Sequence, residues 1–262
     1  MRKRKNNFPQ KFIGILAIIL LATAFIIGYI WKVLNTSDLF LIRQVIVRNS
    51  VESFDYLKNK NIFNVNLNRE SKKAFLKCPD CRKVRFSRIL PDCLVVDFFK
   101  RKPVALIRFS KDFAVDEQGV LFYSDAVMPP EALPVIYGLE TKIAHPEQGA
   151  KYRRPELSLA LSIISEFNVN KAFRIFVLKS VDVANPETAG FFMLLPKPAL
   201  NYGLVNLPAE RSGFEVRIGV GNIKGKLMIL GGLVMQARKD WGNIKYIDLR
   251  FKEPLINLNN VK

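Results

Sequence analysis

The stretch VRFSRILPDCLVVDFFK, residues 84–100, decides the first part of the fold. In residues 84–90, the side chains of Val84, Phe86 and Arg88 alternate with those of Arg85, Ser87 and Ile89, as on the two faces of a strand. Residues 94–100 are rich in branched and aromatic side chains, so each segment predicts a strand. Pro91 and Asp92 lie between them, and proline at the second position of a type I turn fixes φ where that turn needs it. The stretch therefore predicts a β-hairpin.

The residues before this hairpin predict one strand and two short helices. Residues 40–47, FLIRQVIV, are rich in branched side chains and short enough for a strand. Ser50 or Ser53 can cap a first short helix, and Asn68 can cap a second over residues 69–77. The predicted order is strand, helix, helix, strand, strand.

Residues 12–31, FIGILAIILLATAFIIGYIW, contain no charged residue. At about 1.5 Å per residue a helix of this length spans roughly the 30 Å core of a bilayer. Lys32 alone follows closely, whereas Arg2, Lys3, Arg4, Lys5 and Lys11 all precede the run. This bias predicts a transmembrane helix with its N-terminus in the cytoplasm and the rest of the chain exported.

A cleaved secretory signal is the alternative, because Ala22-Thr23-Ala24 has the small-residue pattern of a cleavage site. The apolar run continues past Ala24, and Tyr29 and Trp31 suit the far membrane interface, which favours an uncleaved anchor. In both cases the remaining chain works outside the cytoplasm, where ATP and NAD are not the expected ligands.

The net charge of +18 and the apolar fraction of 49% describe a basic chain with enough apolar residues for real cores. About 230 exported residues fit one large or two modest domains. A basic surface near a membrane favours anionic lipid head groups or acidic wall polymers, and nucleic acid is not an expected partner there. The alternative is an evenly solvated basic surface.

Three cysteines, Cys78, Cys81 and Cys93, allow several interpretations. The C-x-x-C spacing of the first two fits a redox pair, half of a zinc site or a disulfide loop. There is no second C-x-x-C, and the one histidine, His145, stands in a Pro-flanked segment. A structural disulfide or small apolar packing is therefore favoured over catalysis.

The predicted element order is similar to that of a POTRA module, a small α/β sandwich on the exported side of membranes. With the tail, the apolar helix and the run ILPDCLVVDFFKRKPVALI (residues 89–107), the chain resembles the bacterial division protein family FtsQ/DivIB. The residues that match this family here are Arg88, Pro91, Leu94, Val96, Lys102, Pro103, Val104 and Ala105.

The second half also resembles this family. Residues 113–115 and 120–123 predict a hairpin in which Gly119 takes a positive φ. The family's D-x-x-G-x-x-F and LP-x-x-x-G stretches are matched by Asp116, Gly119, Phe122, Leu133, Pro134 and Gly138. Residues 247–251, IDLRF, resemble its terminal ID-x-R-[FY] motif, and residues 215–219 with Lys226 and Leu227 fit its preceding strand and helix.

Further helices and strands are predicted from periodicity. Pro155 suits the first turn of a helix with one apolar face, and Asn222 can cap a helix to about Arg238. Gly231 and Gly232 would each cost this second helix about 1 kcal/mol relative to alanine, so close packing must offset them. Residues 173–178, 190–195, 214–220 and 244–251 predict strands.

Together these features predict an α+β protein. Its expected parts are a basic tail (1–11), a transmembrane helix (12–31), a linker (32–39), a POTRA-like β-α-α-β-β module (40–108), a larger, mostly antiparallel β-domain with two or more packed helices (109–258) and a C-terminal tail (259–262).

No catalytic, cofactor or metal site is predicted. Residues 219–226, GVGNIKGK, lie between a predicted strand and a helix but lack the spacing and the Ser or Thr of a phosphate-binding loop. One histidine cannot build H-E-x-x-H, and there is no G-x-S-x-G.

Sheet edges offer a function instead, because their unpaired backbone groups can template an incoming strand. The family resemblance implies that the last strand docks the small division proteins FtsB and FtsL, with partner residues at Tyr246, Asp248, Arg250, Phe251 and Glu253. The alternative for Ile247, Leu249 and Phe251 is inward packing. Pro254 either ends this edge or is followed by its continuation along residues 255–258.

The predicted function is a non-enzymatic scaffold of the division septum, held in the inner membrane, that links FtsB- and FtsL-like proteins and helps to control septal peptidoglycan synthesis. No small-molecule substrate is expected. One rival is a membrane-anchored thiol oxidoreductase that uses Cys78 and Cys81. Another is a POTRA-type chaperone for exported chains, which predicts tandem modules, whereas the sequence contains one.

Overall fold

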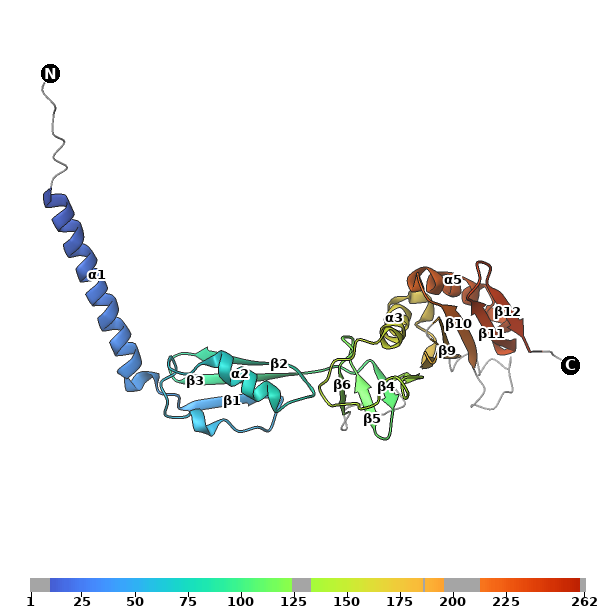
Figure 1. Cartoon of the computed structure of the whole chain (residues 1–262), viewed down its shortest axis with the longest axis horizontal. Coiled ribbons are helices and arrows are strands. Elements are labelled where there is room, and N and C mark those ends of the chain that lie inside the picture. Colours follow the sequence, from blue (N-terminus) through green and yellow to red (C-terminus); the bar gives the residue numbers. More distant parts are fainter. Residues whose placement is uncertain (1–9, 124–132, 186, 196–212, 260–262) are drawn as a thin grey trace, which may run out of the picture. The chain divides into compact units, whose positions relative to one another are not determined.

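The computed structural model describes residues 10–123, 133–185, 187–195 and 213–259. They form two compact units, Met1–Lys100 and Arg101–Lys262 (Figure 1). Most of the predicted tail 1–11 and the last residues of the predicted tail 259–262 lie outside the described residues.

Helix α1, Gln10–Thr36, contains the predicted membrane segment and is longer than expected at both ends. Its residues Gly14–Thr36 are long and apolar enough to cross a membrane, and their side chains are not buried by the rest of the protein. The predicted linker is therefore largely helical, and it ends in the turn η1 (Asp38–Phe40), whose cap Ser37 accepts a bond from the backbone N–H of Leu39. At the end of α1, the Asn61 amide donates to the carbonyls of Leu34 (2.8 Å) and Asn35 (3.1 Å).

The first unit contains a three-stranded sheet in the order β1-β3-β2. Strands β2 (Cys81–Ile89) and β3 (Cys93–Lys100) form the predicted antiparallel hairpin, and β1 (Gln44–Arg48) runs parallel to β3. The hairpin is confirmed, although its Leu90–Pro91 peptide bond is cis. Strand β1 begins later than expected because residues 40–42 bond to residues 60–62 of a loop instead.

One of the two predicted helices of this unit is reduced to a single turn. Segment η2, Asp55–Leu57, is one 3-10 turn, and α2, Leu67–Leu76, is a full helix. Asn66 caps α2, so the prediction of Asn68 was wrong by two residues. Both segments cover the sheet, and the core contains Leu57, Ala74, Val84, Phe86, Leu94, Val96 and Phe98.

The second unit contains a nine-stranded mixed sheet in the order β12-β11-β10-β9-β8-β7-β4-β5-β6. Its strands are β4 (Ala105–Arg108), β5 (Asp112–Val115), β6 (Leu121–Tyr123), β7 (Val135–Tyr137), β8 (Val177–Asp182), β9 (Thr188–Leu194), β10 (Gly213–Gly219), β11 (Ile244–Leu249) and β12 (Leu255–Leu258). The pairs β4–β7, β7–β8 and β10–β11 are parallel, and the other five are antiparallel. Because β4 belongs to this sheet, the second unit begins before residue 109.

The helices of the second unit are α3 (Pro155–Val169) and α5 (Ile223–Gln236), with the 3-10 segments η4 (Lys171–Phe173) and η6 (Arg238–Asn243). Buried residues of α3 and α5 share one core with alternate side chains of the strands. In β9 and β10 every second residue is fully buried and the others are half-buried, so one sheet face packs on the helices.

The helix starts and the glycine packing in this unit largely follow the sequence, and one predicted strand does not form as expected. Pro155 begins α3, and the Asn222 side chain caps α5 by accepting from the Gly225 N–H. Residues 173–178 are not one strand, since Phe173 ends η4 and β8 starts at Val177. A Cβ at Gly231 would lie 3.0 Å from the Ala172 Cβ, which confirms close packing there, whereas Gly232 has nothing within 4 Å.

The predicted hairpin of β5 and β6 is confirmed. Gly119 has a φ of +78°, and Asp116 accepts bonds from the backbone N–H groups of Gln118 and Val120, so the carboxylate fixes the turn. Arg101 pairs with the same carboxylate, and both side chains are buried. Asp116 and Gly119, which match the D-x-x-G-x-x-F stretch, therefore have structural roles in the turn.

Candidate functional site

Strand β12 forms one border of the large sheet. It pairs with β11 on one side, and no described strand lies on its other side. At the opposite border, β6 bonds to the segment after Glu147: the Gly149 N–H donates to Leu121 and the Leu121 N–H donates to Ala150. Among the described residues of this unit, β12 is therefore the border strand with a row of unpaired backbone groups.

The side chains of β12 are apolar and exposed. Leu255, Ile256 and Leu258 are 55%, 40% and 50% exposed, and Asn257 is the remaining residue of the strand. Edge strands are commonly protected by charged residues or proline, and β12 itself carries neither. This strand has the properties of a template for another chain.

The sequence placed the edge one strand too early. Strand β11 lies between β10 and β12, so Tyr246 and Asp248 are interior sheet residues. Arg250, Phe251 and Glu253 lie in the connection to β12, where Phe251 is 59% exposed. Pro254 directly precedes β12, and β12 folds back and pairs with β11, so residues 255–258 cover the edge of β11 instead of continuing it.

The connection from β11 to β12 is held by an ion pair. Asp248 is buried and accepts from the Arg250 backbone N–H at 3.0 Å and from the Arg250 guanidinium at 2.6 to 3.1 Å. These bonds from Arg250 hold the pKa of Asp248 below its ordinary value of 3.8. Asp248 therefore stabilises the bend that leads the chain into the edge strand.

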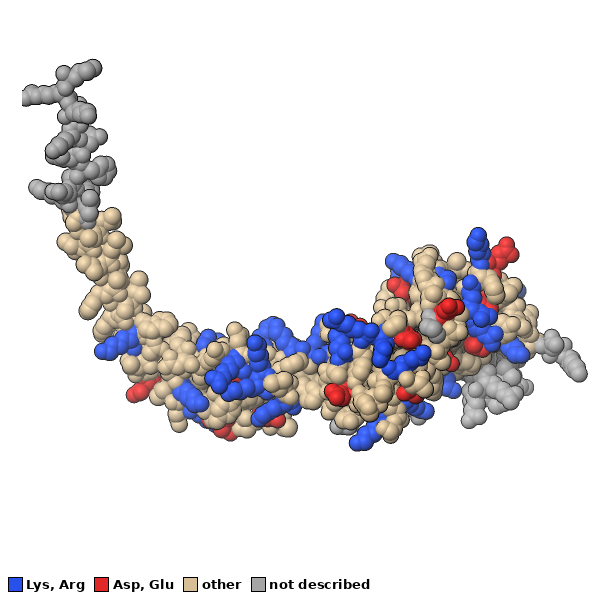
Figure 2. Space-filling view, viewed as in Figure 1, with Lys and Arg blue, Asp and Glu red and all other residues tan. Residues whose placement is uncertain are grey.

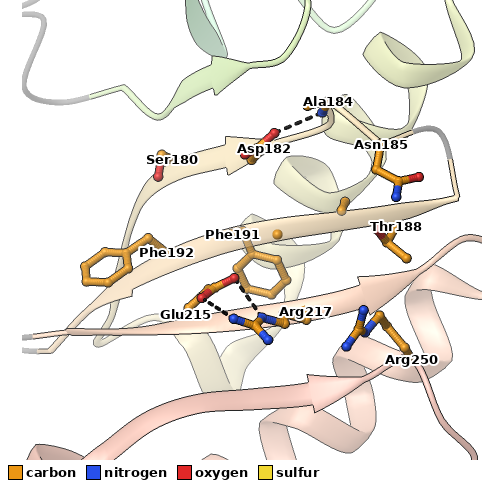
Figure 3. A pocket seen from close by; sticks show the side chains of 12 residues that line it. Ser180, Asp182, Ala184, Asn185, Thr188, Phe191, Phe192, Glu215, Arg217 and Arg250 are labelled. Atoms are coloured by element: carbon orange, nitrogen blue, oxygen red, sulfur yellow. Dashed lines mark hydrogen bonds and ion pairs between the residues drawn. The ribbon is translucent and has the colours of Figure 1, made fainter.

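The open sheet face beside this edge carries a second ion pair. Glu215 accepts two bonds from the Arg217 guanidinium, at 3.0 and 3.2 Å, and that guanidinium lies 4.3 Å from the centre of the Tyr246 ring. Arg217 and Arg250 also line a hollow of about 380 Å³ on this face (Figure 3). The Glu215 bonds raise the pKa of Arg217 above its ordinary value, so the guanidinium stays charged near neutral pH.

Asp248 is unsuited to proton transfer. A catalytic acid or base works best with a pKa near the working pH, which for a carboxyl group means a raised pKa. Asp248 shows the opposite shift because Arg250 stabilises its charged form. The face therefore offers fixed charges and an aromatic ring, which suit recognition.

The glycine-rich segment 219–226, which leads into the first turn of α5, has a structural role. The Lys226 ammonium donates to the carbonyls of Gly219 (2.9 Å) and Val220 (3.3 Å), and so it holds the turn between β10 and α5. His145 is exposed, and its carbonyl accepts from the Tyr152 hydroxyl at 2.9 Å.

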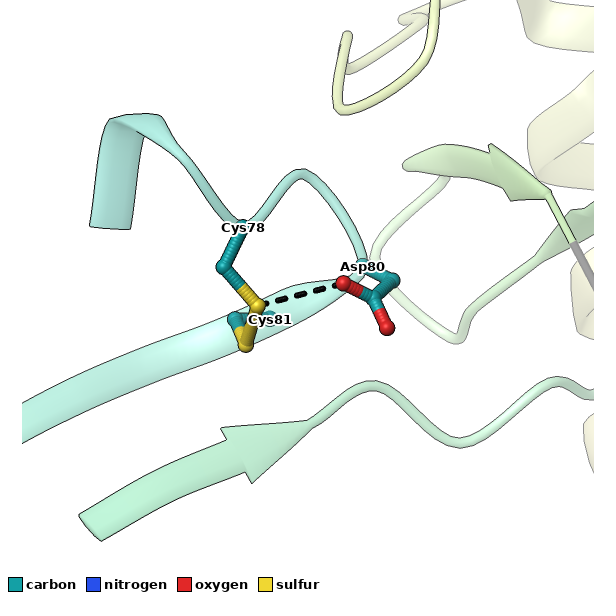
Figure 4. A group of neighbouring side chains, drawn as sticks. All are labelled: Cys78, Asp80 and Cys81. Carbon is teal, nitrogen blue, oxygen red and sulfur yellow. Dashed lines mark hydrogen bonds between the residues drawn. A yellow bond between two sulfur atoms is a disulfide. The ribbon is translucent and has the colours of Figure 1, made fainter. Parts of the chain in front are cut away.

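Cys78 and Cys81 form a disulfide, one of the alternatives the sequence left open (Figure 4). Both are buried, with exposures of 8% and 0%, and Cys93 is a free buried cysteine. Asp80 lies beside Cys78, and the Lys100 ammonium binds the Asp80 carboxylate at 2.6 Å. Burial hinders attack by a substrate thiol, and zinc binding would require thiolates that a disulfide lacks, so the pair suits a structural bond best.

No protein-family model matches the chain. A search of curated proteins finds similarity to the cell division protein FtsQ of Syntrophotalea carbinolica. The two are 24% identical over 233 residues, which cover 86% of this chain and 76% of that protein. The described residues also contain one apolar helix long enough to cross a membrane, near the N-terminus, and an α+β fold. The sequence similarity makes the chain a distant relative of a cell-division protein.

Proposed function

We propose that the protein is a non-enzymatic scaffold of the division septum. Helix α1 anchors it in the inner membrane with the N-terminus in the cytoplasm, and the part of the first unit after α1 and the whole second unit work on the exported side. The uncharged, apolar edge β12 captures a strand of an FtsB- or FtsL-like division protein and so links that partner to septal peptidoglycan synthesis. The similarity to FtsQ supports the division role. The position of β12 at the sheet border and its exposed apolar side chains support strand capture as the mechanism.

Strand addition explains how such an edge would bind. Unpaired N–H and C=O groups of β12 would supply affinity, and alternate side chains would supply specificity. Asp248 opposes Leu255, and Tyr246 opposes Asn257 across the β11–β12 pair. The predicted partner residues of β11 therefore stand one strand away from an incoming chain, where they shape and support the edge. Phe251, at the start of the connection, is available for direct contact.

The edge can be tested by adding charge to it. We expect the variant Leu255→Lys with Leu258→Lys to lose at least about tenfold in partner affinity, equivalent to roughly 1.4 kcal/mol, because charged edge residues oppose strand pairing. Co-purification of the membrane-embedded full chain with co-expressed FtsB-like and FtsL-like proteins measures this.

Two controls accompany this measurement. Val169→Lys places the same change on a residue of α3 that is 75% exposed, and it should leave capture unchanged. Far-ultraviolet circular dichroism should be the same for all variants. Capture by the double variant at the level of the unmodified protein would contradict strand addition at β12. Failure of a fluorescent fusion to gather at midcell would contradict the septal role itself.

A further inference from the structure

The outer face of α2 combines basic residues with one exposed leucine. Glu70 and Ala74 point into the first unit and are buried. Leu76, on the opposite side, is 81% exposed. Residues three, four and seven positions before it share its side of a helix, and these are Lys73, Lys72 and Arg69. We call these four residues, with the adjacent Lys77, the α2 outer face.

The positive charge of this face is poorly neutralised. Glu70 is the one acid in α2. Its buried carboxylate accepts one hydrogen bond from the Tyr56 hydroxyl and one from the Lys73 ammonium at 2.9 Å. Lys72 and Lys77 are exposed and form no ion pair among the described residues, and exposed Arg69 acts on Glu70 through its charge without a direct ion pair. Figure 2 shows Lys and Arg side chains gathered on the part of the first unit where Figure 1 draws α2.

We propose that the α2 outer face docks on the anionic phospholipid head groups of the membrane in which α1 is anchored. The inference rests on the proposed anchor. Clustered Lys and Arg residues are attracted by an anionic surface, and an apolar side chain among them can enter the boundary between head groups and acyl chains. A polyanionic wall polymer would satisfy the cations but would offer nothing to Leu76.

The connection to α1 makes a small patch sufficient. The Asn61 amide bonds the last carbonyls of α1 to the loop that precedes α2, and Asn66 caps α2 five residues later. The unit is therefore held at high effective concentration next to the bilayer, so weak contacts can be occupied. Docking of α2 would restrict the orientation of the first unit at the membrane.

The test uses the full chain in vesicles, with an environment-sensitive NBD label on Leu76→Cys. The native disulfide and the buried Cys93 leave the introduced thiol as the reactive one under non-reducing conditions. We expect severalfold brighter, blue-shifted emission in phosphatidylcholine vesicles that contain phosphatidylglycerol than in pure phosphatidylcholine. The change should vanish at about 0.5 M salt, where the Debye length is roughly 4 Å.

Matched variants distinguish docking of the α2 outer face from nonspecific effects of label position and net charge. In the control Ile46→Cys, the label lies on the other face of the sheet, because Ile46 pairs with Val95, whereas Leu94 and Val96 face the core. The emission of this label should not respond to phosphatidylglycerol. Arg69→Glu with Lys72→Glu should abolish the Leu76→Cys response. An equal charge change at exposed Arg153 and Lys171 of the second unit should preserve it.

The possible outcomes distinguish this inference from the proposed function. If the chain floats with vesicles but the label at position 76 ignores phosphatidylglycerol, the docking proposal is overturned and the anchor stands. A response to an acidic wall polymer alone would overturn it in the same way. If the chain does not float with the vesicles, the proposed anchor itself is wrong.

Discussion

At the scale of single residues, Glu70 links the stability of the first unit to pH. The Tyr56 hydroxyl donates to this buried carboxylate, and together with Lys73 it holds the pKa of Glu70 below its ordinary value of 4.5. Burial, and then the Glu70 charge, raise the pKa of Tyr56 to about 12, so the phenol keeps its proton at neutral pH. A buried acid is thus kept ionised by two donors.

The sign of the pH dependence follows from this lowered pKa. The ionised Glu70 contributes its stability above pH 4.5, and the contribution is lost as pH falls through the lower pKa of the folded state. We expect the unfolding midpoint of the unmodified chain to fall more steeply in acid than that of Glu70→Gln, measured by denaturant titration in detergent. Glu52→Gln, at an exposed loop position, is the control and should keep the steep acid limb. Parallel acid limbs for Glu70→Gln and the unmodified chain would contradict this role.

Two asparagine caps show what local sequence can and cannot predict at this scale. Asn222 was identified correctly because it is the one capping residue between a strand and a long apolar stripe. For α2, both Asn66 and Asn68 fit the local rule. The choice depends on burial, since a start at Leu67 allows Leu67, Glu70 and Ala74 to share the inner face. That face includes a buried glutamate, which periodicity of apolar residues does not reveal.

At the scale of elements, Asn61 connects α1 to the rest of the first unit. This side chain is buried, it donates to Leu34 and Asn35, and it accepts from the Phe63 N–H at 2.9 Å. We expect Asn61→Ala to cost about 1–3 kcal/mol locally, because helix-end carbonyls and a loop N–H lose their partner. Faster backbone hydrogen exchange at the end of α1 and at residues 61–65, in the full chain, would measure it.

Asn64→Ala is the matched control, because Asn64 is an exposed residue of the same loop. It should leave exchange at residues 34–37 unchanged. If both substitutions accelerate exchange equally, the loop is held by other contacts, and Asn61 is not the connection between the helix and the unit.

Elements with a strong local pattern were predictable, and those defined by pairing were not. The hairpin of β2 and β3, the turn at Gly119 and the helices α3 and α5 follow from alternation, turn residues and apolar stripes. Strand β12 has four exposed residues after a proline, so neither alternation nor burial distinguishes it from a tail. Its pairing with β11 moved the candidate site from Tyr246 and Asp248 to the next strand. An edge is a property of sheet order, which local sequence does not contain.

At the scale of the whole molecule, the proposed function makes the apolar helix and the edge strand depend on each other. Strand β12 has four residues, so few backbone bonds are available to a partner. A modest interface is sufficient when both partners are confined to one membrane, because confinement replaces a bimolecular encounter by one at high effective concentration. Such confinement needs a membrane-spanning helix at α1 but no specific side chains on that helix, and the side chains of α1 are not buried by the rest of the protein.

The roles of α1 as an anchor and as a binding surface can be tested separately. Asn61 bonds to backbone carbonyls at the end of α1, so the connection tolerates any helical sequence before them. We expect a chain in which residues 14–33 are replaced by an unrelated apolar span to capture its FtsB-like partner as the unmodified chain does. A soluble chain that begins at residue 34 should bind roughly 10²–10⁴-fold more weakly. Co-purification from membranes and titration of the soluble form measure the two. Loss of capture by the unrelated span would show that α1 itself contacts the partner, and the short edge would then be only part of the interface.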